Sequence, residues 1–341
     1  MGGPIAFSRP IVRRLALAVA PALLACGPPA AGTGGTVVVV DDAGDSVSVR
    51  APASRVVSLI PATTELLFAI GAGSAVVGRT QWCDYPPEAL RVTNLGPGIN
   101  PNLEAVLSVR PDLVVLYNSA QHAAAAARLR ELGIPALRLN TDALADVGRV
   151  GRLLGRLTGH LSGADSMSAA FDTALAAAGA ARRRERRPRV LILAWEQPPM
   201  TLGRGSFLSE LVERAGGENL FGDVASSSAP VSIEAVSARD PDLILTAANG
   251  PASIVDRPEW QVVRAVRERR LLRISGTEYD RPGPRSPGAI RALAARLREV
   301  APCGGPGSQP CSLSWPSPPS CWWRRNCRCC PCRCSWRSRR R

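Results

Sequence analysis

The chain has 341 residues, of which 45% are apolar, and its mean hydropathy is close to zero, at +0.02. This length predicts two domains with additional segments, and this composition excludes a disordered chain and a polytopic membrane protein. All 42 basic residues are arginine. The absence of lysine excludes a Walker A phosphate loop and a pyridoxal Schiff base, because both need a lysine amine.

The formal net charge of +14 comes mainly from the two ends of the chain. Residues 1–25 hold three arginines and residues 303–341 hold eight, with no acidic residue in either stretch. The body between them is therefore close to neutral and has no electrostatic reason to bind a phosphate backbone. We expect no nucleic-acid partner.

The N-terminus has the pattern of an export signal. Arg13 and Arg14 precede an apolar stretch, residues 15–24, that is long enough for a signal peptide but too short to span a bilayer. Small residues before Cys26 resemble a bacterial lipobox, which predicts a signal peptide over 1–25 and a lipid-linked thiol at Cys26. The alternative is a plain secretory signal with an incidental cysteine. A flexible tether is expected over residues 26–41.

The C-terminal segment, residues 303–341, holds eight of the ten cysteines and has no apolar periodicity. Three interpretations stay open: a shifted reading frame, a redox or metal-binding tail, and a basic tail without fixed structure. Without this tail only Cys26 and Cys83 remain, which excludes a disulfide within the body.

Two stretches of the body are related by an offset of 130 residues. Residues 103–106 (LEAV) reappear as 233–236 (IEAV), and residues 111–115 (PDLVV) reappear as 241–245 (PDLIL). Each copy predicts a short helix, a turn and a buried strand.

The repeat extends upstream, where residues 55–60 (RVVSLI) correspond to 189–194 (RVLILA) as a buried strand of the parallel type. A helix with a glycine stop follows each strand. We therefore predict two similar α/β lobes, at residues 42–160 and 187–302. An alanine-rich helix is expected to link them over residues 161–186, and its alternative is an ordinary surface helix of the first lobe.

The order of these motifs resembles one protein family. The lipobox, residues 57–65 (VSLIPATTE), residues 83–87 (CDYPP) and the repeated helix with its Pro-Asp-Leu strand are similar to the helical-backbone, or class III, substrate-binding proteins of metal-chelate ABC importers, most closely the cobalamin-binding members. The resemblance covers about residues 42–300. It implies two Rossmann-like lobes joined by a single long helix, with a ligand in the cleft between them.

Glu104 and Glu234 occupy the same place in the two copies of the repeat. The resemblance implies that each docks onto arginines of a permease dimer, one acid per lobe. The alternative is local, because an acid in the first turn of a helix favours the positive end of the helix dipole.

Aromatic residues at strand ends are candidates for the ligand site, since open α/β sheets bind ligands beyond the carboxyl ends of their strands. A flat macrocycle such as a corrin suits a wall of aromatic rings. The alternative for each is an ordinary rim or core residue. Arg281, with Arg285 nearby, is a candidate to clamp a carboxylate, catecholate or haem propionate. The aromatic candidates are Trp82, Tyr85, Tyr117, Trp195 and Tyr279.

Catalytic chemistry has little support in the sequence. The two histidines, His122 and His160, lie in no nucleophile or metal-ligand motif, and His122 is expected on an exposed helix. Cys83 beside Asp84 is the one candidate for a lipoprotein enzyme, and a structural role for the thiol is the alternative. We expect no catalytic residue, no metal ligand in the body and no cofactor.

These observations predict a lipid-anchored, monomeric solute-binding protein of an ABC importer in the cell envelope, facing the periplasm or the cell exterior. Its predicted ligand is cobalamin or a related corrinoid. The main alternative is a ferric-siderophore or haem receptor of the same class. Less favoured are an enzyme that uses Cys83 and Asp84, and a metal-buffering protein that uses the terminal thiols.

Overall fold

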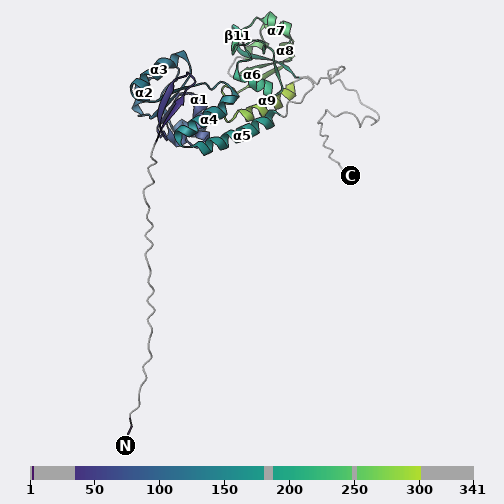
Figure 1. Ribbon diagram of the computed structural model, residues 1–341. Helices are drawn as coiled ribbons and strands as arrows, with labels where there is room; N and C mark the ends of the chain where they lie inside the picture. Colours follow the sequence, from purple (N-terminus) through teal and green to yellow (C-terminus); the bar gives the residue numbers. More distant parts are fainter. Residues whose placement is uncertain (1, 4–34, 180–186, 248–251, 301–341) are drawn as a thin grey trace. The chain divides into compact units, whose positions relative to one another are not determined.

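Two α/β lobes and a connecting helix make up the part of the chain that this computed structural model describes (Figure 1). Residues 2–3, 35–179, 187–247 and 252–300 are described, and all belong to one structural unit that covers residues 1–301. Apart from residues 2–3, the expected signal peptide lies outside them, as do Cys26 and the tail at 303–341. No helix among the described residues has the length and apolarity needed to cross a membrane.

The N-terminal lobe is built on a five-stranded parallel sheet in the order β5-β4-β3-β6-β7. Its strands are β3 (Val56–Ser58), β4 (Val76–Arg79), β5 (Thr93–Asn94), β6 (Leu113–Tyr117) and β7 (Ala136–Leu139). Its helices are α1 (Pro61–Ala69), α2 (Leu103–Ser108), α3 (Ala120–Glu131) and α4 (Leu144–Thr158), with 3₁₀ turns η1 (Gly73–Ala75) and η2 (Pro87–Arg91).

Helices cover both faces of this sheet, which explains why its central strand β6 (LVVLY) is a continuous apolar run instead of alternating. One face packs on Leu66 and Leu67 of α1 and on α4, and the other on Val106 of α2 and Leu129 of α3. The strand order reverses direction between β3 and β6. A crevice opens at such a point in doubly wound sheets.

A hairpin precedes this sheet, so the expectation of a tether as far as residue 41 is wrong at its C-terminal end. Strand β1 (Gly35–Val40) pairs antiparallel with β2 (Ser46–Ala51), and Val39, Val47 and Val49 are buried in the core. The run of valines favours a strand, and Gly44 takes the positive φ, +87°, that the turn requires.

The C-terminal lobe has a sheet in the order β11-β9-β8-β12-β13, and β10 also pairs with β8. Its strands are β8 (Arg189–Glu196), β9 (Pro199–Leu202), β10 (Glu218–Asn219), β11 (Ser228–Pro230), β12 (Leu243–Ala247) and β13 (Leu271–Ile274). Its helices are α6 (Phe207–Arg214), α7 (Ile233–Arg239), α8 (Arg264–Arg267) and α9 (Ser286–Val300), with 3₁₀ turns η4 (Ala252–Val255), η5 (Pro258–Val262) and η6 (Thr277–Tyr279).

The repeat that the sequence predicted is present in atomic detail. The Asp112 carboxylate accepts from the Arg55 amide at 2.9 Å, and the Asp242 carboxylate accepts from the Arg189 amide at 2.9 Å. Even the unusual positive φ recurs 130 residues apart, +44° at Arg110 and +42° at Asp240. The predicted fold class, two Rossmann-like α/β lobes, is confirmed.

Helix α5 (Leu161–Gly179) is the connecting helix, and residues 180–186 of the expected 161–186 lie outside the described chain. Its 19 residues make a rod of about 28 Å. It packs against α1 and α4 of the first lobe and against α9 of the second. One hydrophobic cluster runs through all of these helices, and it includes Phe171 of α5, Leu154 of α4 and Ile290 of α9. The link is therefore buttressed by both lobes.

Substituting Gly163 of α5 by alanine is expected to destabilise the protein by about 1–3 kcal/mol. A Cβ atom there would lie far inside van der Waals contact of the Ile70 carbonyl oxygen at the end of α1, and backbone cannot rotate away. Gly179→Ala is the matched control in the same helix, because nothing lies within 4 Å of its Cβ position. Urea unfolding of both variants measures the difference, and equal midpoints would contradict the close packing of α5 on α1.

Candidate functional site

A cavity with a volume of about 790 Å³ lies between the two lobes. This is the size of a pocket for a substantial small molecule. The first lobe contributes residues that follow the carboxyl ends of its strands, including Ile60 after β3, Thr141 after β7 and Trp82 after β4. The second lobe contributes Leu202 and the start of α6. We call this cavity the cleft.

Two aromatic side chains stand on the first-lobe side of the cleft. Trp82 lines it and is 56% exposed, so its indole ring is largely bare. Tyr117, at the end of β6, also lines it, and its hydroxyl donates to both carboxylate oxygens of Asp142 at 2.8 and 2.9 Å. Burial, followed by this bond to Asp142, raises the pKa of Tyr117 to about 12. The phenol therefore remains a hydrogen-bond donor at any physiological pH.

Three other predicted aromatic residues lie outside the lining of the cleft. Tyr85 lies below Arg285, whose guanidinium carbon is 4.2 Å from the ring centre. Trp195 is 63% exposed at the end of β8, and its indole donates to the Gln197 carbonyl oxygen at 2.7 Å. Tyr279 is only 8% exposed and belongs to the hydrophobic core of the second lobe.

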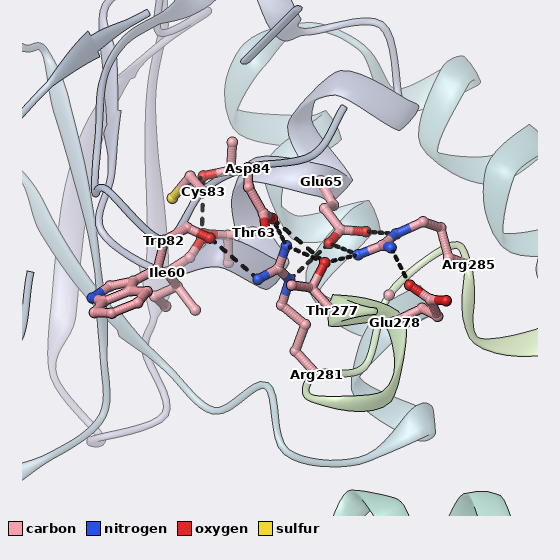
Figure 2. Close-up of polar contacts among 12 residues, drawn as sticks. Ile60, Thr63, Glu65, Trp82, Cys83, Asp84, Thr277, Glu278, Arg281 and Arg285 are labelled. Carbon is pink, nitrogen blue, oxygen red and sulfur yellow. Dashed lines mark hydrogen bonds and ion pairs between the residues drawn. The ribbon is translucent and has the colours of Figure 1, made fainter. Parts of the chain in front are cut away.

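Arg281 lines the cleft, but its guanidinium is bound across the two lobes (Figure 2). Its Nε donates to Glu65 of α1 at 2.7 Å, Nη1 donates to the Trp82 carbonyl oxygen at 3.2 Å, and Nη2 pairs with Asp84. In this structure the guanidinium that was expected to clamp a ligand carboxylate is therefore engaged by the first lobe. Arg281 already donates its hydrogen bonds to the first lobe. Glu65 needs such partners because its carboxylate is buried.

Arg285 completes this cross-lobe cluster, which consists of Glu65, Asp84, Glu278, Arg281 and Arg285. The Glu65 side chain is 2% exposed and accepts from Arg285 at 2.9 Å through Nε and at 2.7 Å through Nη2. Desolvation lowers the pKa of Arg285, but the hydrogen bonds and charge of Glu65 outweigh it and raise the pKa overall. Two lobes are thereby tied through one buried carboxylate (Figure 2).

Carboxylates dominate the charge that lines the cleft. Asp84, Asp142 and Asp280 line it, whereas Arg281 is the single basic residue of that lining. Desolvation raises the pKa of Asp280; Arg281 opposes the rise, and Asp84 and Glu278 reinforce it. Its carboxyl therefore takes up a proton at a higher pH than an ordinary aspartate.

The loop that carries Trp82 is held by a buried thiol. Cys83 is fully buried, and its Sγ accepts from the Thr64 hydroxyl at 3.1 Å and lies 3.2 Å from the Thr80 hydroxyl. This supports the structural interpretation of Cys83, since a reactive thiol must be accessible and close to a positive charge. The bonds fix the loop against α1.

His122 is buried instead of exposed, contrary to the expectation from the sequence. Its Nδ1 lies 2.9 Å from the Tyr117 carbonyl oxygen, and its Nε2 lies 2.8 Å from that of Gly98. The alanine run after it suggested an outer helix face, but the ring bridges the end of β6 and the 96–98 loop. It therefore positions the backbone of Tyr117.

Glu104 and Glu234 stand on equivalent helices, as the repeat predicted. Each is the second residue of its helix, and each lies two positions after a capping side chain, Asn102 or Ser232, that accepts from the amide three residues on at 3.1 Å. Both acids are exposed. A hydrogen bond from its own amide, followed by one from the Ser232 hydroxyl, lowers the pKa of Glu234. The N-terminal ends of α2 and α7 thus present matching anionic side chains.

Comparison with known proteins identifies the family. The model of the periplasmic binding protein family matches residues 56–276. The chain belongs to this family. The vitamin B12-binding protein of Vibrio cholerae is 27% identical over 248 residues, which cover 72% of this chain and 90% of that protein. An uncharacterised ABC transporter substrate-binding lipoprotein of Bacillus subtilis is 28% identical over 269 residues, or 76% of this chain and 85% of that protein.

Solved structures of similar periplasmic binding proteins agree with this. The apo haem-binding protein of Roseiflexus sp. RS-1 superposes with a TM-score of 0.65 and 28% identity, over 72% of this chain and 98% of that one. The vitamin B12-binding protein of Vibrio cholerae gives 0.63 and 26%, over 73% and 98%. This periplasmic binding protein is the substrate-binding component of an ABC importer and works outside the cytoplasm; its family consists of solute-binding proteins and not of enzymes.

The sequence missed the residue on which the site depends most. Glu65 lies in the helix that follows the first predicted strand and is not among the predicted site residues, and its partners Arg281 and Arg285 lie 216 and 220 residues away. A glutamate inside the run ATTELL is one available signal, because an isolated buried carboxylate is costly and needs a cation.

Proposed function

We propose that this periplasmic binding protein captures cobalamin or a related corrinoid in the cleft and delivers it to its permease. The lining of the cleft carries this proposal. An exposed indole, Trp82, and the phenol of Tyr117 offer apolar surface to a flat macrocycle, and three carboxylates offer acceptors to its rim. A corrin carries neutral amide side chains, whose N–H groups are donors for such acceptors.

The same lining argues against the haem and siderophore alternative, although a haem-binding protein is among the similar structures. Haem propionates and ferric catecholates are anionic. Two like charges at 4 Å repel by about 1 kcal/mol in water and by about 4 kcal/mol at an effective dielectric constant near 20. Arg281 is bound to Glu65 and neutralises Asp84, so this repulsion rests on Asp142 and Asp280.

Titration of the purified protein with cyanocobalamin is expected to quench tryptophan fluorescence with a Kd in the micromolar range or below, and haemin is expected to bind at least about tenfold more weakly. Trp82→Ala should weaken cobalamin binding by about 10- to 100-fold, since one buried aromatic ring contributes that much. Trp195→Ala is the matched control, because this indole lies outside the lining of the cleft. Tighter binding of haemin, or equal losses in both variants, would contradict the proposal.

Delivery is proposed to depend on Glu104 and Glu234, which would dock one on each half of a permease dimer. Lipidation of Cys26 is proposed to anchor the protein, as a monomer, to the membrane that faces the periplasm or the cell exterior. The similarity to a Bacillus subtilis substrate-binding lipoprotein supports the anchor. Equal exposure and equivalent capping of the two acids support the docking role.

A further inference from the structure

A second, smaller cavity of about 310 Å³ lies beside the cleft, within the C-terminal lobe. We call it the annex. Its walls come from the carboxyl end of β8 (Ile192, Leu193 and Ala194), from β12 (Leu245 and Thr246) and from the ring of Tyr279. It therefore stands where ligands bind in open α/β sheets.

The annex adjoins the cleft directly. Leu202, Ser206, Phe207 and Asp280 line both cavities. The annex is therefore within reach of an appendage of a ligand that occupies the cleft. The volume of the annex lies at the lower end of the range of about 300–1,000 Å³ for whole ligand pockets, so it suits an appendage and not a macrocycle.

The walls of the annex are mainly apolar, in contrast to the acidic lining of the cleft. Ile192 and Leu245 are partners in the parallel register of β8 and β12, and both belong to the hydrophobic core with Phe207 and Tyr279. The Ser206 hydroxyl donates to the Gly203 carbonyl oxygen at 3.0 Å and accepts from the Ser209 amide at 3.1 Å. These two bonds hold the Ser206 hydroxyl at the N-terminal cap of α6.

Such walls favour an apolar occupant over water. A well-held water needs two to four polar partners, and displacement of a poorly held one by an apolar group increases affinity. Phe207 and Tyr279 add aromatic faces, which pack well against a planar ring. The chemistry therefore selects a compact, flat, apolar group that is covalently attached to a larger polar body.

We propose that the annex binds the aromatic base at the end of the nucleotide arm of a corrinoid while the corrin ring occupies the cleft. This rests on the proposed function and deepens it, because it distinguishes complete corrinoids from those that lack the arm. Cobalamin carries a dimethylbenzimidazole base on this arm, whereas cobinamide has the same corrin ring and no base. The annex would make the receptor selective for the complete form.

Ala194→Phe tests this proposal in the full-length protein, because the new ring fills the annex from an exposed position. Cyanocobalamin and cobinamide are the two probes, measured by isothermal titration calorimetry. We expect the wild type to prefer cyanocobalamin. Ala194→Phe should weaken cyanocobalamin by about 10- to 100-fold, as expected for exclusion of one aromatic ring, and change cobinamide binding by less than about twofold.

Trp195→Phe is the matched control, since Trp195 is exposed on the same strand and lines neither the cleft nor the annex, so both affinities should stay unchanged. If Ala194→Phe fails to fold, Thr246→Leu reduces the annex from the β12 side and carries the same expectation. Equal effects on the two probes, or no effect on either, would overturn the annex proposal and leave the proposed function standing. Failure of the wild type to bind either corrinoid would instead overturn the proposed function.

Discussion

Alanine at both Glu104 and Glu234 is expected to reduce cobalamin uptake into cells by about 10- to 100-fold while the Kd of the purified protein stays within about twofold. The loss of one docking charge pair changes the rate of association or dissociation by roughly tenfold. The two acids stand on separate lobes and neither lines the cleft, so their effects should add.

The competing explanation is that the two acids only stabilise their own helices, and the size of that stabilisation is known. An acid in the first turn of a helix contributes about 0.3–1 kcal/mol, which is too little to unfold the protein. Glu131→Ala is the matched control, because Glu131 is equally exposed but sits at the C-terminal end of α3. Normal uptake by the double variant, or a parallel loss in the control, would remove the docking role.

The lobes were predictable because their signal is local and occurs twice. Each copy of the Pro-Asp turn, at Asp112 and at Asp242, starts a strand by accepting from a neighbouring amide of the same lobe. All residues of such a motif lie within one short stretch of consecutive residues. A second occurrence at a fixed offset of 130 residues argues against a chance match between the two copies.

The site was only partly predictable, because its contacts are not local. Trp82 and Tyr117 were found from their places at strand ends, and both line the cleft. Tyr279 also follows a strand, but it is only 8% exposed and lines the annex instead of the cleft, and no pattern in the sequence reports the direction of one side chain. The role of Arg281 depends on Glu65 in the other lobe, a pairing that a single sequence does not contain.

Glu65→Gln is expected to lower the free energy of unfolding by about 3–5 kcal/mol, which is a large part of the 5–15 kcal/mol typical of a folded domain. The substitution keeps the size of the side chain but removes its charge, so Arg281 and Arg285 lose the carboxylate that they share. Glu131→Gln is the control: its pair with Arg128 is exposed and should contribute less than about 1 kcal/mol. Urea midpoints for both variants measure the contrast.

A second substitution separates charge from packing in this cluster. In the double variant Glu65→Gln, Arg285→Gln one of the two cations that share Glu65 is removed together with its pair to Glu278, while Arg281 still pairs with Asp84. The double variant should therefore regain part of the stability that Glu65→Gln loses, as a positive coupling between neighbouring sites. If the second substitution only adds its own loss of unfolding free energy to that of Glu65→Gln, the cluster stabilises the protein through packing. Ligand affinity should follow the same order, because the cluster holds Trp82 and Asp84 at the wall of the cleft.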